Sequence, residues 1–230
     1  NVDNMLSQQV NLKFAKDKNI TIAPNGAMFR RDKQGFLPEL MEKMYGDRVI
    51  YKKKMMEAKK EFQKTKDPIY KNEIARCHNI QMAKKIALNS AYGAIGNQYF
   101  RYFDVKQAEA ITLGGQLSIR WVERDVNKFM NKVLETNNQN YVVASDTDSI
   151  YISMGKLVDK VCKDKTPQQV SDFLDKVSEQ KLQKIIDKSF DNLADYVNAF
   201  QQKMVMKREA IANKGIWVAK KRYMLNLFDE

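Results

Sequence analysis

The chain has 230 residues, and its 40 Lys and Arg against 28 Asp and Glu give a net charge of +12. A surplus of this size favours a polyanionic partner, either nucleic acid or an anionic membrane surface. No apolar run approaches the roughly 18 residues of a membrane-spanning helix, and residues 1–18 are polar and mixed, so we expect neither a transmembrane segment nor secretion.

The sulfur and imidazole side chains are few. Two cysteines, Cys77 and Cys162, are too few for a disulfide framework and fit a reducing compartment. The one histidine, His78, lies in a helical pattern and cannot form a metal site alone. We therefore expect a structural role for His78.

The first clear elements are a short hairpin and a pair of long helices. Residues 20–23 and 27–30 flank Pro24-Asn25-Gly26, and Asn-Gly supplies the positive φ that a hairpin turn needs. From Pro38 to Lys66 the pattern is helical and basic, with a thin apolar seam. Asp67-Pro68 then predicts a helix cap followed by proline at the first helical position, with a second helix from about Ile69 to about Tyr92. Such helices should pack as an antiparallel hairpin that projects from the body, or else form an ordinary solvated helix pair.

Several donors on these two helices could surround one space. Lys85, Asn89 and Tyr92 are spaced i, i+4 and i+7 and so share one helix face. Arg48 and Lys52 form an i, i+4 pair on the facing helix. Charged and amide donors in this arrangement could grip a triphosphate.

The remainder of the chain alternates long helices with short strands. Asp104 should cap a helix from about Val105 to about Glu135, in which Gly114-Gly115 suggests close packing against a neighbour. Its predicted buried face comprises Ala108, Ile111, Leu117, Trp121, Val122, Phe129 and Val133. Thr166-Pro167 should begin another helix that runs to about Phe200. Two strands should follow, Lys203–Ala212 and Ile216–Phe228.

The segment from Tyr141 to Ile152 carries two aspartates between apolar strands. We expect two short strands joined by a tight turn at Asp146-Thr147, with Asp146 and Asp148 projecting to one side. Two neighbouring carboxylates repel each other unless a cation lies between them, and hard oxygen ligands suit Mg²⁺. The alternative is an Asx-type hairpin turn without a metal.

Three motifs, centred on Lys85–Gly93, Asp146–Asp148 and Lys220–Tyr223, follow one another along the chain. Together they resemble the motifs of family B DNA polymerases. Lys85-x-x-x-Asn89-Ser-x-Tyr92-Gly93 resembles the fingers motif of that family, and Ser145-Asp146-Thr-Asp148-Ser149 resembles its palm motif. Lys220-Lys221-Arg222-Tyr223 is similar to the family's primer-gripping motif. The sequence around the motifs is most similar to polymerases of T-even-type bacteriophages, and the resemblance covers residues 24–230.

This resemblance implies an α+β fold, with a palm of antiparallel strands packed on long helices and a protruding helical hairpin as fingers. The implied parts are a β-hairpin segment beside the palm at 1–36, the fingers at 37–97 and the palm at 98–230. The implied activity is addition of deoxynucleotides to a primer 3′-end on template DNA by a two-metal mechanism with two Mg²⁺ ions. A phage protein of this kind would work in the cytoplasm of the infected host cell, with no membrane partner.

The resemblance also implies roles for the matching residues. The triphosphate of a deoxynucleoside triphosphate would contact Arg48, Lys52, Lys85 and Asn89, and the nascent base pair would lie against Tyr92 and Gly93. Asp148 would bind metal directly, with Asp146 and Glu209 as accessory carboxylates. The primer strand of primer–template DNA would be held by Lys220, Lys221, Arg222 and Tyr223.

The sequence also departs from the family pattern. Ala144-Ser145 replaces the usual Tyr-Gly before the aspartates, and no Asp-x-x-Ser-Leu-Tyr-Pro-Ser-like run is present to supply a second metal-binding strand. Exonuclease and thumb regions are also not recognised. Because two-metal catalysis needs carboxylates from two strands, we expect the chain to be inactive alone. The alternatives are a split polymerase subunit that needs its amino-terminal portion as a separate chain, and a non-catalytic DNA-binding module.

Overall fold

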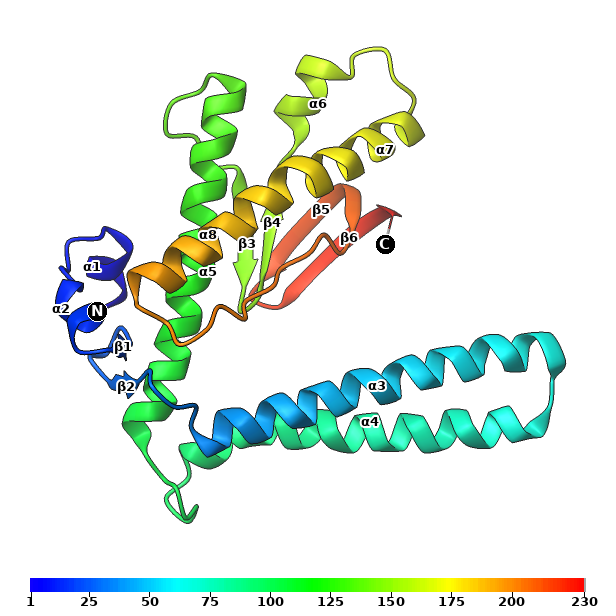
Figure 1. Ribbon diagram of the computed structural model, residues 1–230. Helices are drawn as coiled ribbons and strands as arrows, with labels where there is room; N and C mark the ends of the chain where they lie inside the picture. Colours follow the sequence, from blue (N-terminus) through cyan, green and yellow to red (C-terminus); the bar gives the residue numbers. More distant parts are fainter. Residues whose placement is uncertain (230) are drawn as a thin grey trace. The chain divides into compact units, whose positions relative to one another are not determined.

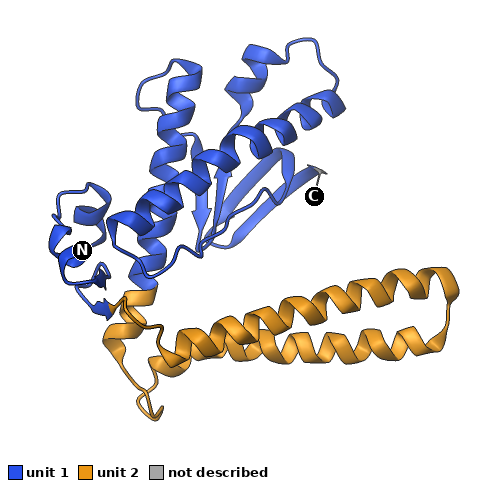
Figure 2. Cartoon of the chain, viewed as in Figure 1, with its two compact units in different colours: residues 1–29, 112–230 blue, residues 30–111 orange. Residues whose placement is uncertain are grey.

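The structure is a computed structural model that describes residues 1–229. Its chain divides into two compact units, residues 1–29 with 112–230 and residues 30–111, as Figure 2 shows. The units combine long helices with small antiparallel sheets, which confirms the predicted α+β class. Within residues 1–229, we find no helix with the length and hydropathy needed to cross a membrane.

The unit of residues 30–111 is built on a helical hairpin. Helices α3 (Phe36–Thr65) and α4 (Pro68–Ile95) pack side by side over their lengths (Figure 1). Lys66 takes a left-handed φ of 57°, and the Asp67 side chain accepts a hydrogen bond of 2.9 Å from the Ile69 amide. Pro68 occupies the first helical turn, where its missing N–H costs nothing. The predicted cap and break are therefore confirmed.

The contact between these two helices is narrow. In the whole pair only Ala58, Cys77, Gln81 and Ile95 are buried among the described side chains. A salt bridge of 2.7 Å joins Lys84 Nζ on α4 to Asp47 Oδ2 on α3. The thin apolar seam expected from the sequence is confirmed, and part of the pairing is polar.

The other unit has a denser core. Helix α5 (Val105–Leu134) begins in the second unit and continues here, where α6 (Gly155–Val161), α7 (Pro167–Val177) and α8 (Gln183–Tyr196) belong to the same unit. A π-helical turn at Ser178–Leu182 connects α7 to α8. Thr166 and Gln169 form a reciprocal capping box at the start of α7, which confirms the predicted helix start. The main core cluster comprises Val122, Val126, Met130, Leu134, Tyr141, Val142, Leu157, Leu182, Ile186 and Phe190.

The predicted buried face of α5 is partly right. Leu117, Trp121 and Val122 are buried as expected. Ile111 and Val133, at 51% and 41% exposure, were wrongly assigned to the buried face. Gly114-Gly115 does not mark close packing, since a Cβ at either position would meet no described atom within 4 Å.

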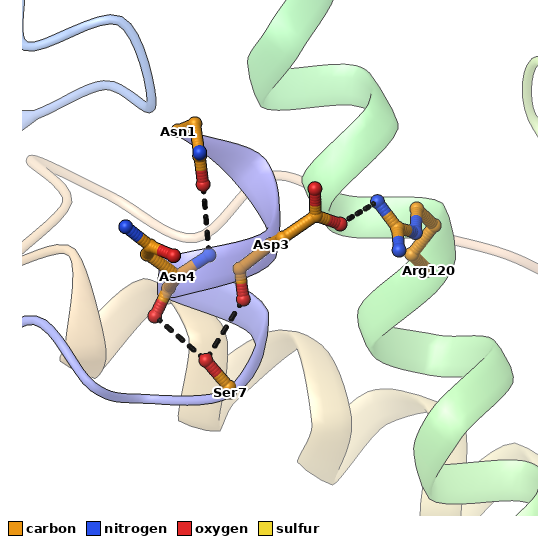
Figure 3. Close-up of polar contacts among 5 residues, drawn as sticks. All are labelled: Asn1, Asp3, Asn4, Ser7 and Arg120. Atoms are coloured by element: carbon orange, nitrogen blue, oxygen red, sulfur yellow. Dashed lines mark hydrogen bonds and ion pairs between the residues drawn. The ribbon is translucent and has the colours of Figure 1, made fainter.

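The first 30 residues pack on α5 and α8 through a second cluster. Helices α1 (Val2–Leu6) and α2 (Lys13–Asp17) were not predicted, because five-residue helices lack a sequence period and depend on tertiary contacts. Asn1 caps α1 through the Asn4 amide, and Arg120 Nη1 donates to Asp3 Oδ1 over 2.7 Å (Figure 3). The predicted hairpin is confirmed as β1 (Ile20–Ile22) and β2 (Met28–Arg30), with Gly26 at a φ of 81°.

Two further antiparallel hairpins complete this unit. One joins β3 (Val142–Asp146) to β4 (Ser149–Ile152), and the other joins β5 (Ile211–Ala219) to β6 (Arg222–Asp229). The strand predicted at Lys203–Ala212 is wrong, because residues 201–210 have no regular structure. The strand predicted at Ile216–Phe228 is also wrong. Lys221 adopts a φ of 61° and turns the chain back within it.

Candidate functional site

The aspartate motif forms the tip of the β3–β4 hairpin. Asp146 ends β3 and pairs with Ser149, so Thr147 and Asp148 make the turn. The predicted turn at Asp146-Thr147 is thus one residue too early. Thr147 has a φ of 52°, and the Asp148 amide donates to the Asp146 carbonyl over 2.6 Å. Asp148 is a turn residue, so strand alternation does not determine the direction of its side chain. The prediction that Asp146 and Asp148 project to one side therefore lacks the support that strand alternation would give.

The two carboxylates carry uncompensated charge. Asp146 is half-buried and its Oδ1 accepts a hydrogen bond of 2.9 Å from Thr147 Oγ1. Asp148 is exposed, and neither aspartate forms an ion pair with any described residue. Unpaired aspartate oxygens are hard donors that suit Mg²⁺, so these residues fit one side of a magnesium site. Across residues 1–229 no group of three or more His, Cys, Asp or Glu is arranged to hold a metal.

Glu209, the third predicted carboxylate, is exposed in the irregular segment 201–210. Its neighbours are anchored to α7 and to the start of α8. Arg208 Nη2 contacts Asp175 Oδ1 over 2.6 Å, and Gln183 Nε2 donates to the Met206 carbonyl over 2.8 Å. Glu209 itself makes no ion pair or side-chain hydrogen bond with the described residues. It does not combine with the two aspartates into a three-carboxylate cluster.

The aspartate hairpin is fixed to the helical core at its base. Asn127 of α5 accepts hydrogen bonds through Oδ1 from the amides of Tyr141 and Val142, over 2.7 and 3.1 Å. The Tyr141 ring is buried, and Ile150 and Ile152 of β4 pack against the main core cluster. Sequence reasoning missed Asn127, because nothing local distinguishes it from other polar residues of α5. The hairpin base is rigidly held, while its acidic tip is open to solvent.

The opposite side of β4 contacts the second hairpin through aromatic rings. Tyr151 lies 5.3 Å from Trp217 and 5.4 Å from Tyr223, measured between ring centroids. Hydrogen bonding with Tyr223, followed by burial, raises the pKa of the Tyr151 phenol. Sequence reasoning named Tyr223 and missed Tyr151 and Trp217. Only the contact between Trp217 and Tyr223 is a cross-strand pair within one hairpin, which aromatic residues favour. The contacts of Tyr151 join two separate sheets and leave no local signal in the sequence.

The basic motif forms the turn of the β5–β6 hairpin. Lys220 and Lys221 are the turn residues and Arg222 begins β6. All three side chains are exposed, and none forms an ion pair with a residue that the structure describes. Three unpaired cations at one turn offer a site for phosphate groups.

The predicted triphosphate donors occupy the helical hairpin. Lys85 and Asn89 are exposed on α4, Lys52 is exposed on α3, and Arg48 is half-buried. None of these four side chains forms a hydrogen bond or ion pair within residues 1–229, and the Arg48 Nε atom is buried without a partner. The structure confirms the helical spacing, while the gripping of a triphosphate stays a prediction.

Two other residues of the predicted fingers motif lie near the end of α4. Tyr92 is 46% exposed, and a Cβ at Gly93 would meet no described atom within 4 Å. Lys84, next to Lys85, faces α3 instead and pairs with Asp47, lowering the pKa of that carboxyl through their hydrogen bond.

Comparison with known proteins places this arrangement in a family. Residues 2–230 match the model of DNA polymerase family B. The chain is 32% identical to the DNA-directed DNA polymerases of Enterobacteria phage T4 and Escherichia phage RB69, over 90% of its own length and 29% of theirs. It is also 32% identical to DNA polymerase 1 of Pyrococcus abyssi, over 60% of this chain and 15% of that protein.

The chain therefore spans less than a third of the length of its phage relatives. Within that span, the three motifs occur in order on helix α4 and on two β-hairpin turns, with most of their charged side chains unpaired among the described residues. The predicted relationship to phage polymerases is confirmed. This chain belongs to DNA polymerase family B.

Proposed function

We propose that this chain is the palm and fingers portion of a DNA-directed DNA polymerase that extends a primer 3′-end on a DNA template. Family membership over residues 2–230 carries the proposal. The phage relatives are named as DNA-directed DNA polymerases, which supports the same reaction here. The proposed parts keep the predicted boundaries, 1–36 beside the palm, 37–97 as fingers and 98–230 as palm.

In this proposal the helical hairpin binds the incoming deoxynucleoside triphosphate. Arg48, Lys52, Lys85 and Asn89 offer donors that no described protein group occupies. A triphosphate carries several negative oxygens, and charge-assisted hydrogen bonds to them are stronger than neutral ones. Tyr92 and Gly93 would lie against the nascent base pair, where a small residue allows close approach.

Asp148 and Asp146 would hold Mg²⁺, with Glu209 as an accessory carboxylate. Magnesium bound there would activate the primer hydroxyl and steady the leaving pyrophosphate. The chain's own carboxylates would hold the ions and offset part of their charge. Further oxygen ligands would have to come from water, from substrate phosphates or from another strand of the polymerase.

The basic turn would position the primer. Lys220, Lys221 and Arg222 can bind backbone phosphates without reading sequence, and Tyr223 can contact the minor groove. Placing this turn in the same unit as Asp148 supports a shared role at the primer end. In phage relatives such work would take place in the infected host cell.

Primer extension tests the proposal. Because two-metal catalysis needs carboxylates from two strands, the purified chain should show no extension with Mg²⁺ and four deoxynucleotides. Adding a separately produced amino-terminal portion of the polymerase should restore extension if this is one half of a split enzyme. Extension by the chain alone would contradict the proposed incompleteness, and failure of every reassembled form would contradict the polymerase function.

A DNA-binding module without catalysis is the second candidate, favoured by the net charge of +12. Such a chain should bind duplex DNA with a dissociation constant on the order of 10⁻⁶ M or weaker, and binding should weaken steeply as salt rises. Salt-dependent binding together with absent extension in all reassembled forms would favour this candidate.

A further inference from the structure

Three aromatic rings join the two hairpins that carry the acidic and basic turns. Tyr151 of β4 forms edge contacts with Trp217 of β5 and Tyr223 of β6, at 5.3 and 5.4 Å between centroids. Trp217 and Tyr223 also stack on each other at 6.4 Å. The two hairpins are separate two-stranded sheets, so no backbone ladder connects them. The three rings therefore supply a direct side-chain link between them.

Strand alternation explains why Tyr151 reaches the second hairpin. Its neighbours Ile150 and Ile152 pack against the main core cluster, and side chains of successive strand residues point to opposite faces. The core thus fixes one face of β4 and directs Tyr151 toward β5 and β6. Tyr151 has no freedom to turn inward without displacing a core residue.

A glycine lets Trp217 lie close to its own strand. Trp217 and Tyr223 are register partners across β5 and β6. The indole ring of Trp217 lies over Gly215, where an added Cβ would come within 2.7 Å of the ring and 2.9 Å of Leu225. Any side chain at this position would push the indole away, so Gly215 is part of the same arrangement.

The ring cluster lies three residues from each charged turn. Tyr151 follows Asp148 by three positions, and Trp217 precedes Lys220 by three, about 10 Å of strand in each case. Figure 1 shows the turns of both hairpins at the same end of this unit. A shift of the rings would therefore be transmitted over a short stretch of backbone to both turns, which on β5 includes a register irregularity between Trp217 and Ala219.

We propose that Trp217 is a positioning residue, which fixes the basic turn of Lys220 and Lys221 against the acidic turn of Asp146 and Asp148 through Tyr151. The inference rests on the proposed function, in which these turns hold the primer and the metal ions. Trp217 itself touches neither substrate. It sets where the primer end lies relative to the carboxylates, so its loss should slow incorporation without weakening nucleotide binding by the helical hairpin.

The test uses a reassembled polymerase that extends primers, with single-turnover incorporation measured over a range of nucleotide concentrations. Trp217→Ala removes both ring contacts and should lower the maximal rate about 3- to 10-fold, given typical aromatic pair strengths. The nucleotide concentration for half-maximal rate should stay unchanged. Trp217→Phe retains a ring and should recover most of the rate.

Val218→Ala is the matched control, because Val218 is the next residue of β5, is 67% exposed and has no part in the ring cluster. Equal rates for Trp217→Ala and Val218→Ala would overturn the positioning role. The positioning role would also be overturned if Trp217→Ala raised only the nucleotide concentration for half-maximal rate and left the maximal rate unchanged. A wild-type reassembly without activity would instead overturn the proposed function on which the inference rests.

A spectroscopic measurement keeps the proposal testable if Trp217→Ala folds poorly. In a Trp121→Phe background the remaining tryptophan is Trp217, which is 39% exposed. Binding of primer–template duplex at the basic turn should change its emission, and Tyr151→Leu should reduce that change at least 2-fold at saturating duplex. Unaltered emission on duplex binding, or an equal response in the Tyr151→Leu protein, would contradict the coupling.

Discussion

The helical hairpin and the unit of residues 1–29 and 112–230 present charged groups in contrasting ways. Helices α3 and α4 bury few side chains, and their hydrogen-bond donors project from helices with little core packing. The acidic and basic turns instead extend from strands that are anchored to a packed core and to an aromatic cluster. We infer that ligand contacts and folding stability are nearly independent on the helical hairpin. In the other unit, they depend on the same packing.

The largest expected effect is on core stability. Met130 is 1% exposed within the main core cluster, so Met130→Ala should lower the free energy of unfolding by about 2–5 kcal/mol. Leu88→Ala on the half-buried side of α4 is the comparison and should cost clearly less. Urea unfolding of both variants measures the difference. Equal losses would mean that the two units are equally well packed.

Removal of the proposed metal ligand should affect catalysis and spare folding. Asp148 is exposed and has no described partner, so Asp148→Asn should leave the unfolding midpoint unchanged. In the reassembled polymerase its incorporation rate should fall roughly 10²- to 10³-fold, since metal charge stabilisation is worth several kcal/mol. Glu209→Gln should cost less, as an accessory position. A larger loss for Glu209→Gln would reverse the two assignments.

The proposed triphosphate-binding residues of the helical hairpin should show a different kinetic pattern from Trp217, because their loss should also weaken nucleotide binding. Lys85→Ala removes a charge-assisted phosphate contact and should raise the nucleotide concentration for half-maximal rate, with slower incorporation, by roughly 10- to 150-fold in combined efficiency. Lys71, on the same helix about 21 Å away along its axis, forms no ion pair with a described residue and makes a suitable control. Single-turnover kinetics of both alanine variants decide the assignment, and similar small effects would refute it.

The smallest expected effect concerns the polar part of the α3–α4 seam. Lys84 lowers the pKa of Asp47, so this pair stabilises the folded hairpin above the ordinary aspartate pKa, and the contribution disappears as pH falls through the lowered value. Lys84→Ala should therefore slightly reduce the thermal midpoint at pH 7 and leave it unchanged at about pH 2. A difference that persists in acid would show that lost packing, rather than charge, is responsible.

Local signals allowed much of the helical architecture to be predicted from sequence. Asp67-Pro68 and Thr166-Gln169 act within one helical turn, so their effect does not depend on the rest of the fold. The two functional turns were harder. Thr147 and Lys221 adopt positive φ values without being glycine or asparagine, and the pairing of the flanking strands imposes that conformation.

The candidate site was predicted as a set of residues, and its supporting contacts were not. Motif spacing named the aspartates, the basic turn and the helical donors, most of which are charged or polar side chains that the fold leaves exposed. Asn127 and Trp217 were missed because their importance comes from partners that lie far away in sequence. The Lys84–Asp47 pair was missed for the same reason, since only the pairing of α3 with α4 brings the two residues together.

The narrow seam between α3 and α4 has a consequence for motion. With few buried side chains to separate, the two helices should open at a lower free energy than that of global unfolding. Amide hydrogens along the hairpin should then exchange with deuterated solvent well before those of α5 between Leu117 and Met130. A triphosphate bridging the helices would bind the closed pair and protect these amides in proportion to its concentration. Amide exchange in α3 and α4 would thus report nucleotide binding without requiring the chain to catalyse primer extension.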